Sequence, residues 1–184
     1  MVFGGYGLYL LFSLPALILG LWAQSRVRSA FAKYSRVRTG AGLSGAQVAR
    51  RVLDSQGLVD VAVEAAGGFM SDHYDPRSKT LRLSPDVFRS NSMAAAGVAA
   101  HEAGHAMQDR RGYMPLKLRT SMVPTVQIGS WLGPLVFIAG LLLRPAVGTS
   151  LAWVGLALFA ATAVFSLVTL PVELDARRRA KKVL

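Results

Sequence analysis

Apolar residues in this chain are gathered into long blocks, and residues 1–25, 120–143 and 145–172 contain no Asp, Glu, Lys or Arg. Each block is long enough to cross a hydrocarbon core of about 30 Å at about 1.5 Å per residue. A buried helix of a soluble core is the alternative for one block, but three such blocks in 184 residues leave no soluble domain large enough to bury them. We therefore predict transmembrane helices over 1–25, 120–143 and 150–172, with a link over 144–149.

Basic residues border these blocks and orient the chain. A signal peptide carries its positive charge before the apolar core, whereas here the charges follow the first block, so we interpret it as a retained helix with its N-terminus outside. By the positive-inside rule, residues 26–119 and 173–184 face the cytoplasm, and the link around Arg144 faces outward. The flanking basic residues are Arg26, Arg28, Lys33, Arg36 and Arg38, then Lys117 and Arg119, and finally Arg177, Arg178, Arg179, Lys181 and Lys182.

The net charge of +11 has its source in these flanking residues. A strongly basic chain can indicate nucleic acid binding, but no basic groove with interleaved aromatic residues is present, so we expect no nucleic acid partner. Contact with anionic lipid head groups of the bilayer is the simpler account. The chain has no cysteine, which excludes disulfides and thiolate metal ligands.

The segment between the first and second blocks is predicted to form a small cytoplasmic domain that mixes helices and strands. Ser44 followed by Gln47 is a capping-box pattern, and it predicts a helix that runs to about Ser55. Gly57 ends that helix. The alternation of apolar and polar residues over 59–63 then predicts a strand.

A hairpin and a longer helix are predicted next. Strands are expected at 72–74 and 80–83, since residues 75–79 between them favour a tight turn. The edge of this hairpin could pair with an extended substrate peptide, or the hairpin could only complete a small sheet, and both alternatives remain open. A helix follows over about 92–109, with Ser90 or Asn91 as its N-cap.

Residues 101–105, on this predicted helix, form an HExxH box. Residues four apart lie on one helix face, so His101 and His105 can present two imidazole nitrogens to one metal ion. Zn²⁺ binds imidazole and carboxylate ligands, and a catalytic zinc keeps one position open for a water from which Glu102 could take a proton. Two solvated histidines on a helix are the alternative. The chain has three histidines and two lie in the box, which favours the metal site.

A catalytic zinc site uses three protein ligands, so a third residue is needed. No histidine follows His105, and the candidates are His73, Asp109, Glu173 and Asp175. Asp109 lies farther along the same helix and is better suited to support the ligands than to bind the metal. Asp175 is two residues from Glu173 on a helix, and therefore points about 200° away from it.

Glu173 is the preferred third ligand because of its place in the chain. It is the first charged residue after the third apolar block, at the edge of the hydrocarbon, where an unpaired carboxylate is costly. Two membrane crossings separate it from His105, so both residues return to the cytoplasmic side. The alternative is a surface glutamate paired with Arg177 one turn later.

Several runs of the sequence together resemble the bacterial neutral zinc membrane metallopeptidases, the YugP-type proteases. The resemblance covers nearly the whole chain, and its residues are 71–76 (SDHYDP), 81–85 (LRLSP), 97–106 (GVAAHEAGHA), 112–119 (GYMPLKLR) and 170–173 (LPVE). It implies an integral protein of the bacterial inner membrane, with a zincin-like α+β domain on the cytoplasmic side. It also implies Zn²⁺ as the cofactor, His101 and His105 as ligands, Glu102 as the catalytic residue and Glu173 as the downstream glutamate ligand of glutamate-zincins.

The chain departs from the family pattern in two places. Broader relatives such as HtpX and the CAAX prenyl proteases tend to carry Glu-x-x-Ala-Asp, whereas Arg177 follows Ala176 here, so no aspartate takes that supporting role. Family members tend to continue past the position of Leu184 with another apolar segment, so we expect this sequence to be a shortened version.

The sequence predicts a membrane-embedded zinc endopeptidase that cleaves membrane proteins or membrane-proximal segments. Glu102 acts as general base, and His73 or Tyr74 is expected to stabilise the oxyanion. The alternative is a non-catalytic membrane interaction protein with a structural zinc, for which His73 would be a fourth ligand. A membrane-protein partner or an oligomer is compatible with either function.

Overall fold

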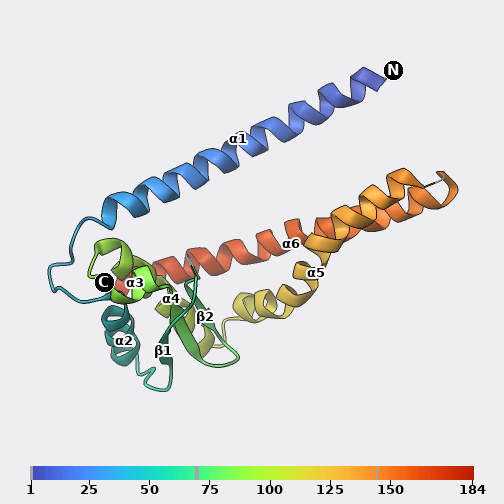
Figure 1. The fold of residues 1–184 in the computed structure, drawn as a ribbon. Coiled ribbons are helices and arrows are strands. Elements are labelled where there is room, and N and C mark those ends of the chain that lie inside the picture. Colours follow the sequence, from blue (N-terminus) through green and yellow to red (C-terminus); the bar gives the residue numbers. More distant parts are fainter. Residues whose placement is uncertain (1, 69–70, 144) are drawn as a thin grey trace.

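The computed structural model describes residues 2–68, 71–143 and 145–184, and the chain is mostly helical with one small sheet. Figure 1 shows the sheet and the shorter helices gathered at one end, from which α1 and the α5–α6 pair extend. This arrangement agrees with the predicted combination of a small α+β domain and long apolar helices. The elements in chain order are α1 (Val2–Tyr34), α2 (Gly45–Ser55), β1 (Ala62–Ala65), β2 (His73–Asp75), β3 (Thr80–Leu83), α3 (Pro85–Arg89), α4 (Met93–Arg110), α5 (Met114–Leu142) and α6 (Pro145–Val183).

The start of α2 is the capping box that the sequence predicts. The Ser44 side chain accepts a hydrogen bond from the Gln47 amide, and the Gln47 side chain accepts one from the Ser44 amide. These two bonds satisfy amides that would otherwise lack partners at the helix start. Gly57 follows the helix with a φ of +68°, the left-handed conformation that glycine adopts without strain.

The first strand begins later than predicted. Strand β1 spans Ala62–Ala65 rather than 59–63. The reason lies in Arg50 of α2, whose guanidinium donates hydrogen bonds to the backbone carbonyls of Leu58 and Val61. This contact holds residues 58–61 in a turn, so pairing with the sheet begins only at Ala62.

The sheet has three strands in the order β1-β3-β2, and the predicted hairpin of β2 and β3 is confirmed. Tyr74 pairs with Leu81 across this antiparallel hairpin, while β1 pairs with β3 in parallel. Asp75 builds the turn by accepting hydrogen bonds from the Arg77 amide and the Ser78 hydroxyl. Strand β2 is therefore at one end of the sheet, and it contacts α4.

Helix α4 has nearly its predicted extent, but its N-cap is Ser92 and not Ser90 or Asn91. The Ser92 hydroxyl accepts the hydrogen bond from the Ala95 amide. Ser90 and Asn91 are held outside the helix because their carbonyls accept bonds from the amides of Gly45 and Thr39. The cap is thus set by a contact with the segment before α2, which lies far away in the sequence.

The core of the small domain is built where α4 packs against α2, α3 and the sheet. Helix α4 contributes alanines, whose small side chains let the neighbouring elements approach closely. The larger side chains come from the other elements, and Leu53, Leu81, Leu83 and Val87 are fully buried. This packing fixes the position and rotation of the helix that carries the HExxH box.

Helices α5 and α6 contain the second and third apolar blocks, and in length and composition both could cross a membrane. Their large apolar side chains are mostly exposed in this chain, with Trp131 at 71% and Leu167 at 72%. Helix α5 starts at Met114, before the predicted span, and α6 starts at Pro145. Residues 145–149 of the predicted link are therefore helical, and Arg144 lies outside the described residues.

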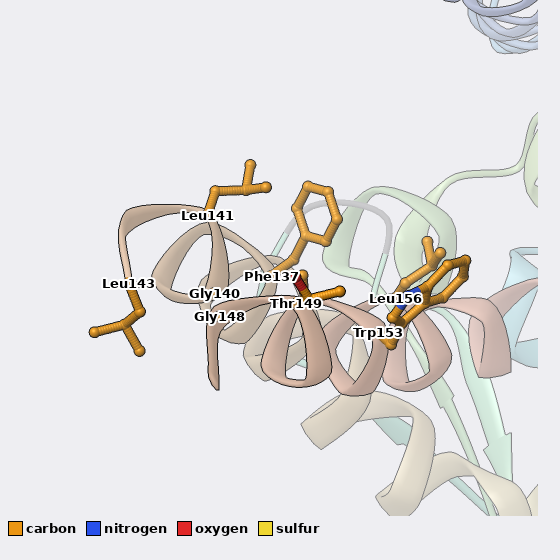
Figure 2. A pocket seen from close by; sticks show the side chains of 9 residues that line it. Phe137, Gly140, Leu141, Leu143, Gly148, Thr149, Trp153 and Leu156 are labelled. Atoms are coloured by element: carbon orange, nitrogen blue, oxygen red, sulfur yellow. The ribbon is translucent and has the colours of Figure 1, made fainter. Parts of the chain in front are cut away.

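Helices α5 and α6 lie side by side, and glycines allow their backbones to approach closely. A Cβ built on Gly155 of α6 would lie 2.4 Å from the Phe137 amide nitrogen, and one on Gly140 of α5 would lie 2.5 Å from the Ala152 nitrogen. Figure 2 shows Gly140 and Gly148 where the two helices meet near their connection, with Leu141 and other apolar side chains directed outward. Such small residues are typical of helix pairs within membranes.

The first apolar block forms part of α1, a continuous helix that ends at Tyr34. Its side chains are exposed along residues 14–30, and Phe31 packs against the core of the small domain. Helix α1 thus joins the rest of the chain through its C-terminal end, as Figure 1 shows. Its role as a transmembrane helix stays a prediction.

Candidate metal centre

The two histidines of the HExxH box lie on the face of α4 that meets α6. Their ring centroids are 4.9 Å apart, with the ring planes nearly perpendicular. His105 is buried, and His101 is half-buried. The spacing of four residues on a helix therefore directs both imidazoles to one region, as the sequence predicts.

Glu173 reaches the same region from α6. Its Oε2 lies 3.0 Å from His101 Nε2 and 3.6 Å from His105 Nε2. The donor atoms of His101, His105 and Glu173 all lie within 4.8 Å of one another, so these three residues could hold a metal ion. Contacts from His101 first and then from His105 lower the pKa of Glu173 well below its usual range, so the carboxylate is charged.

The donor spacing fits a zinc ion. Ligand atoms about 2.0–2.1 Å from a tetrahedral zinc are separated by roughly 3.3 Å, and the two measured spacings lie on either side of that value. Two imidazole nitrogens and one carboxylate oxygen are also a donor set found in catalytic zinc sites. The residues present therefore fit the metal that the sequence predicts.

Gln108 prepares His105 for this role. The Gln108 carbonyl accepts a hydrogen bond from His105 Nδ1 at 3.0 Å, which leaves His105 Nε2 free to bind a metal. The Gln108 amide donates to the Val172 carbonyl at 2.8 Å and to Asp175 Oδ2 at 2.9 Å. This fully buried side chain therefore both orients His105 on α4 and holds α6 against α4.

A glycine inside the HExxH box brings α6 close enough for these contacts. A Cβ on Gly104 would lie 2.7 Å from the backbone oxygen of Ala176 and 3.3 Å from its Cα. Any side chain there would push α6 away from α4. Gly104 thus sets the distance over which Glu173 must reach the histidines.

Comparison with known proteins agrees with this geometry. Residues 9–184 match the model of a family described as "Putative neutral zinc metallopeptidase". The chain belongs to this family. It is also similar to the "Putative membrane protease YugP" of Bacillus subtilis (strain 168), with 44% identity over 177 residues that cover 96% of this chain and 77% of the relative. No solved structure matches the chain.

Glu102, the remaining charged residue of the HExxH box, is buried beside the histidines. Burial is the main cause that raises its pKa, because a low-dielectric surrounding disfavours the charged carboxylate. It does not belong to the three-residue donor group among the described residues. Glu102 is thus available to exchange protons next to the metal centre.

The residues of the β2–β3 hairpin have their own hydrogen-bond partners. Tyr74 is buried, and its hydroxyl donates to Asp109 Oδ2 at 2.7 Å. Burial first, and this bond second, raise the pKa of Tyr74 well above its usual value. His73 is exposed and its Nδ1 donates to the Ser71 carbonyl at 2.7 Å. Its Nε2 can therefore donate a hydrogen bond only when the ring is protonated.

Asp109 faces the hairpin and not the histidines, since it accepts hydrogen bonds from Tyr74 and from Lys79. The sequence predicts that Asp109 supports a metal ligand, but in the structure its neighbour Gln108 does so, by accepting the hydrogen bond from His105. Asp175 is not in the donor group, as predicted, and it accepts bonds from Gln108 and Arg179. No local sequence signal marks Gln108, because its burial and its bonds to α6 exist only once the two helices have packed.

Arg119 is the second functional residue that the sequence did not reveal. Its Nη2 lies 3.5 Å from Glu173 Oε1, the oxygen that does not face the histidines. The alternative pairing of Glu173 with Arg177 does not occur in the described structure, where Arg119 of α5 takes that place. Because Arg119 precedes the predicted second span, sequence reasoning used it only to orient the chain.

Proposed function

We propose that the chain is a membrane-embedded zinc endopeptidase that hydrolyses peptide bonds of membrane proteins or of segments close to the membrane. The observation that carries this proposal is the meeting of His101 and His105 on α4 with Glu173 on α6, residues that are separated by two long apolar helices. A chance pair of histidines on a helix would have no reason to meet a partly buried carboxylate from a distant segment.

In this mechanism His101, His105 and Glu173 would hold the zinc ion, and Glu102 moves protons. A bound zinc ion supplies Lewis acidity, which activates water and polarises the scissile carbonyl. Glu102 accepts the proton of the attacking water and delivers it to the leaving amine, a role that suits a carboxylate whose pKa is raised by burial. His73, in its protonated form, is the better candidate to stabilise the oxyanion, because the Tyr74 hydroxyl is engaged by Asp109.

The substrate backbone would pair with β2. This strand is at an end of the sheet and contacts α4, so its outer edge can accept an extended peptide next to the HExxH helix. A paired peptide is held straight, which presents one carbonyl to the metal. The position of β2 supports the substrate-binding interpretation of the hairpin over a purely structural one.

The proposal places the active site at the cytoplasmic face of a membrane. Exposed apolar side chains along α5 and α6 require an apolar solvent, and two crossings return the chain to the side of the small domain. The basic residues around that domain favour the cytoplasm and contact with anionic lipids, and we expect no nucleic acid partner. Reporter fusions at residues 101 and 173 should report the same compartment.

A structural zinc site is the rival function. Structural sites are usually closed by four protein ligands, whereas catalytic sites use three and leave room for water. The donor group in the described part of the chain contains three residues, and His73 is not among them. This count supports the catalytic function.

The deciding experiment compares the full chain with three variants, purified in detergent and assayed with zinc or a chelator. Glu102→Gln should keep stoichiometric zinc and lose at least about 10²-fold in cleavage of a model protein. Glu173→Ala should lose zinc. Glu64→Gln is the matched control, since Glu64 is an exposed glutamate on β1, and it should behave as the wild type. Cleavage retained by Glu102→Gln would contradict the mechanism, and zinc retained by Glu173→Ala would reassign the third ligand.

A further inference from the structure

An apolar hollow opens beside the metal centre, between the C-terminal end of α1 and the start of α4. Its volume is about 690 Å³, within the range of roughly 300–1,000 Å³ that is typical of ligand pockets. His101 and Glu102 form part of its wall, so the hollow is continuous with the proposed catalytic residues. The apolar part of the wall includes Phe31 and Tyr34 of α1 and Gly97 and Val98 of α4.

A second hollow of about 440 Å³ lies on the other side of the centre, between the hairpin and α5. His105 lies in its wall, together with the basic residues Arg77 and Arg119. Cationic groups in a wall bind polar or acidic groups and disfavour apolar ones. The wall of this second hollow also contains Asp75 and apolar residues such as Leu116, so it is mixed, whereas the wall of the α1–α4 hollow is mostly apolar and suits an apolar ligand better.

The segment that leads into strand β2 joins the two hollows. Asp72 belongs to the wall of the α1–α4 hollow, and the next residue, His73, belongs to the wall of the α5 hollow. A peptide paired with β2 would thus pass from one hollow to the other across the metal centre. The residues on one side of its scissile bond would enter the apolar hollow, and those on the other side would enter the hollow of mixed character.

We propose that the α1–α4 hollow binds a short apolar stretch of the substrate directly beside the scissile bond, and that Gly97 sets the size of the side chains it accepts. This inference rests on the proposed peptidase function and adds its substrate class, peptides with large apolar residues on one side of the cleaved bond. Helix α1 forms part of the wall and is predicted to enter the membrane. The hollow is therefore accessible from the membrane, where apolar segments are concentrated.

Gly97 offers a direct way to fill the hollow. It lies one turn before His101 on α4, and a Cβ built there would meet no atom within 4 Å. Leucine is a good helix former, so Gly97→Leu should fold without strain and place its side chain in the hollow. Gly20 of α1 is also a helical glycine with open space around its Cβ and is not part of the hollow. Gly20→Leu is therefore the matched control.

The first measurement is the cleavage of a peptide series by the zinc-loaded full chain in detergent, with Ala, Leu or Phe at successive positions around the bond. We expect kcat/KM at least tenfold higher for Leu or Phe than for Ala, on one side of the bond only. Gly97→Leu should reduce this preference at least tenfold, because it lowers kcat/KM for the Leu and Phe peptides far more than for the Ala peptide, and it should leave the zinc content unchanged. Gly20→Leu should match the wild type. Equal losses for all peptides, or no change for any, would overturn the inference.

A second measurement separates this inference from the proposed function. Binding of a Phe-containing peptide to zinc-loaded Glu102→Gln protein is followed by fluorescence anisotropy, with and without Gly97→Leu. Weaker binding in the double variant would support the hollow as a peptide site. If the wild type at the same time cleaved no peptide, that result would contradict only the peptidase function. Binding that is insensitive to Gly97→Leu would overturn the hollow, and cleavage by the wild type would then still support the peptidase.

Discussion

Helix α6 makes two contacts of different character, one with α5 along its apolar part and one with α4 near its C-terminal end. Both contacts use glycine to bring backbones together, at Gly155 in the first and at Gly104 in the second. Apart from the ion pair of Arg119 with Glu173, no side-chain hydrogen bond joins α5 to α6 among the described residues. The contact with α4 contains a fully buried amide, Gln108, whose polar atoms are all directed at α6 or at His105.

The difference shows how a metal centre can be assembled from separate helices. Apolar packing is not directional, so it tolerates small changes in the register of two helices. Buried hydrogen bonds are directional, and leaving one unmade costs about 1–3 kcal/mol. The bonds of Gln108 to Val172 and Asp175 therefore fix the register at which Glu173, between them in sequence, faces the histidines.

Gly104→Ala should have the largest effect, because it forces the α4–α6 contact apart. The added methyl would lie 2.7 Å from the Ala176 oxygen, and that oxygen belongs to backbone that cannot simply rotate away. Displacing a catalytic group by about an ångström can reduce activity about 10²-fold, and we expect that loss together with weaker zinc binding. Zinc content after dialysis measures the zinc binding, and kcat/KM measures the loss of activity.

Gly97→Ala is the control for this change, since it adds the same methyl to the same helix where nothing lies within 4 Å. It should keep zinc at the wild-type level and raise the free energy of unfolding by up to about 1 kcal/mol, because alanine is the better helix former. Wild-type zinc binding by Gly104→Ala would show that the close approach of the helices is not required for the site.

Gln108→Leu tests the directional part of the same contact. The leucine removes the acceptor for His105 Nδ1 and the donor to the Val172 carbonyl, and loss of such supporting bonds typically reduces metal affinity 10–100-fold. Competition with a chelator of known affinity measures this change.

Gln108→Glu separates the two roles of the side chain. Glutamate can still accept from His105, but its carboxylate cannot donate to the Val172 carbonyl. If the anchoring of α6 matters, this variant should also lose zinc affinity. Affinity equal to the wild type would assign Gln108 to the orientation of His105 alone.

Much of the small domain was predictable because its signals are local. The capping box of Ser44 and Gln47, the turn at 75–79 and the spacing of the HExxH box each act within a few residues. The shifts in the structure come from long-range contacts, such as Arg50 holding the turn before β1. The short helix α3, which has only five residues, carried no periodic pattern that could predict it.

The candidate site divides in the same way. His101 and His105 follow from helical spacing, and Glu173 followed from counting membrane crossings, which requires no knowledge of packing. Gln108 and Arg119 act only after α6 and α5 have packed against their neighbours, so a single sequence could not reveal them. The three residues of the donor group were thus predictable, and the residues that position them were not.

Gly155→Ala tests the apolar contact of α6 and should have a smaller effect. Its methyl would lie 2.4 Å from the Phe137 amide nitrogen, so the α5–α6 pair must shift. Overpacking of this kind costs about 1–3 kcal/mol, which should lower the thermal midpoint in detergent. Zinc content should stay at the wild-type level, because the α4–α6 contact is separate. Val154→Ile adds one methyl on the exposed face beside it and should change neither quantity.

Tyr74→Phe concerns the contact of α4 with the hairpin, and it should have the smallest effect. The Tyr74 hydroxyl donates to Asp109, which also accepts from Lys79, so Asp109 keeps a partner when the hydroxyl is removed. The net value of such a bond is about 0.5–1.5 kcal/mol, and thermal unfolding should report a loss of this size.

The kinetics of Tyr74→Phe decide whether this contact is structural or catalytic. The burial of Tyr74 and its bond to Asp109 keep the hydroxyl away from the donor group of the metal centre, so kcat should stay within about threefold of the wild type. An oxyanion donor would instead lose about 10²–10³-fold in kcat on removal. A loss of that size, with zinc content and thermal midpoint unchanged, would move Tyr74 into the catalytic machinery and leave His73 without that role. A small loss of kcat would show that the Tyr74–Asp109 hydrogen bond only positions the hairpin against α4, as the hydrogen bonds of Gln108 position α6 against α4.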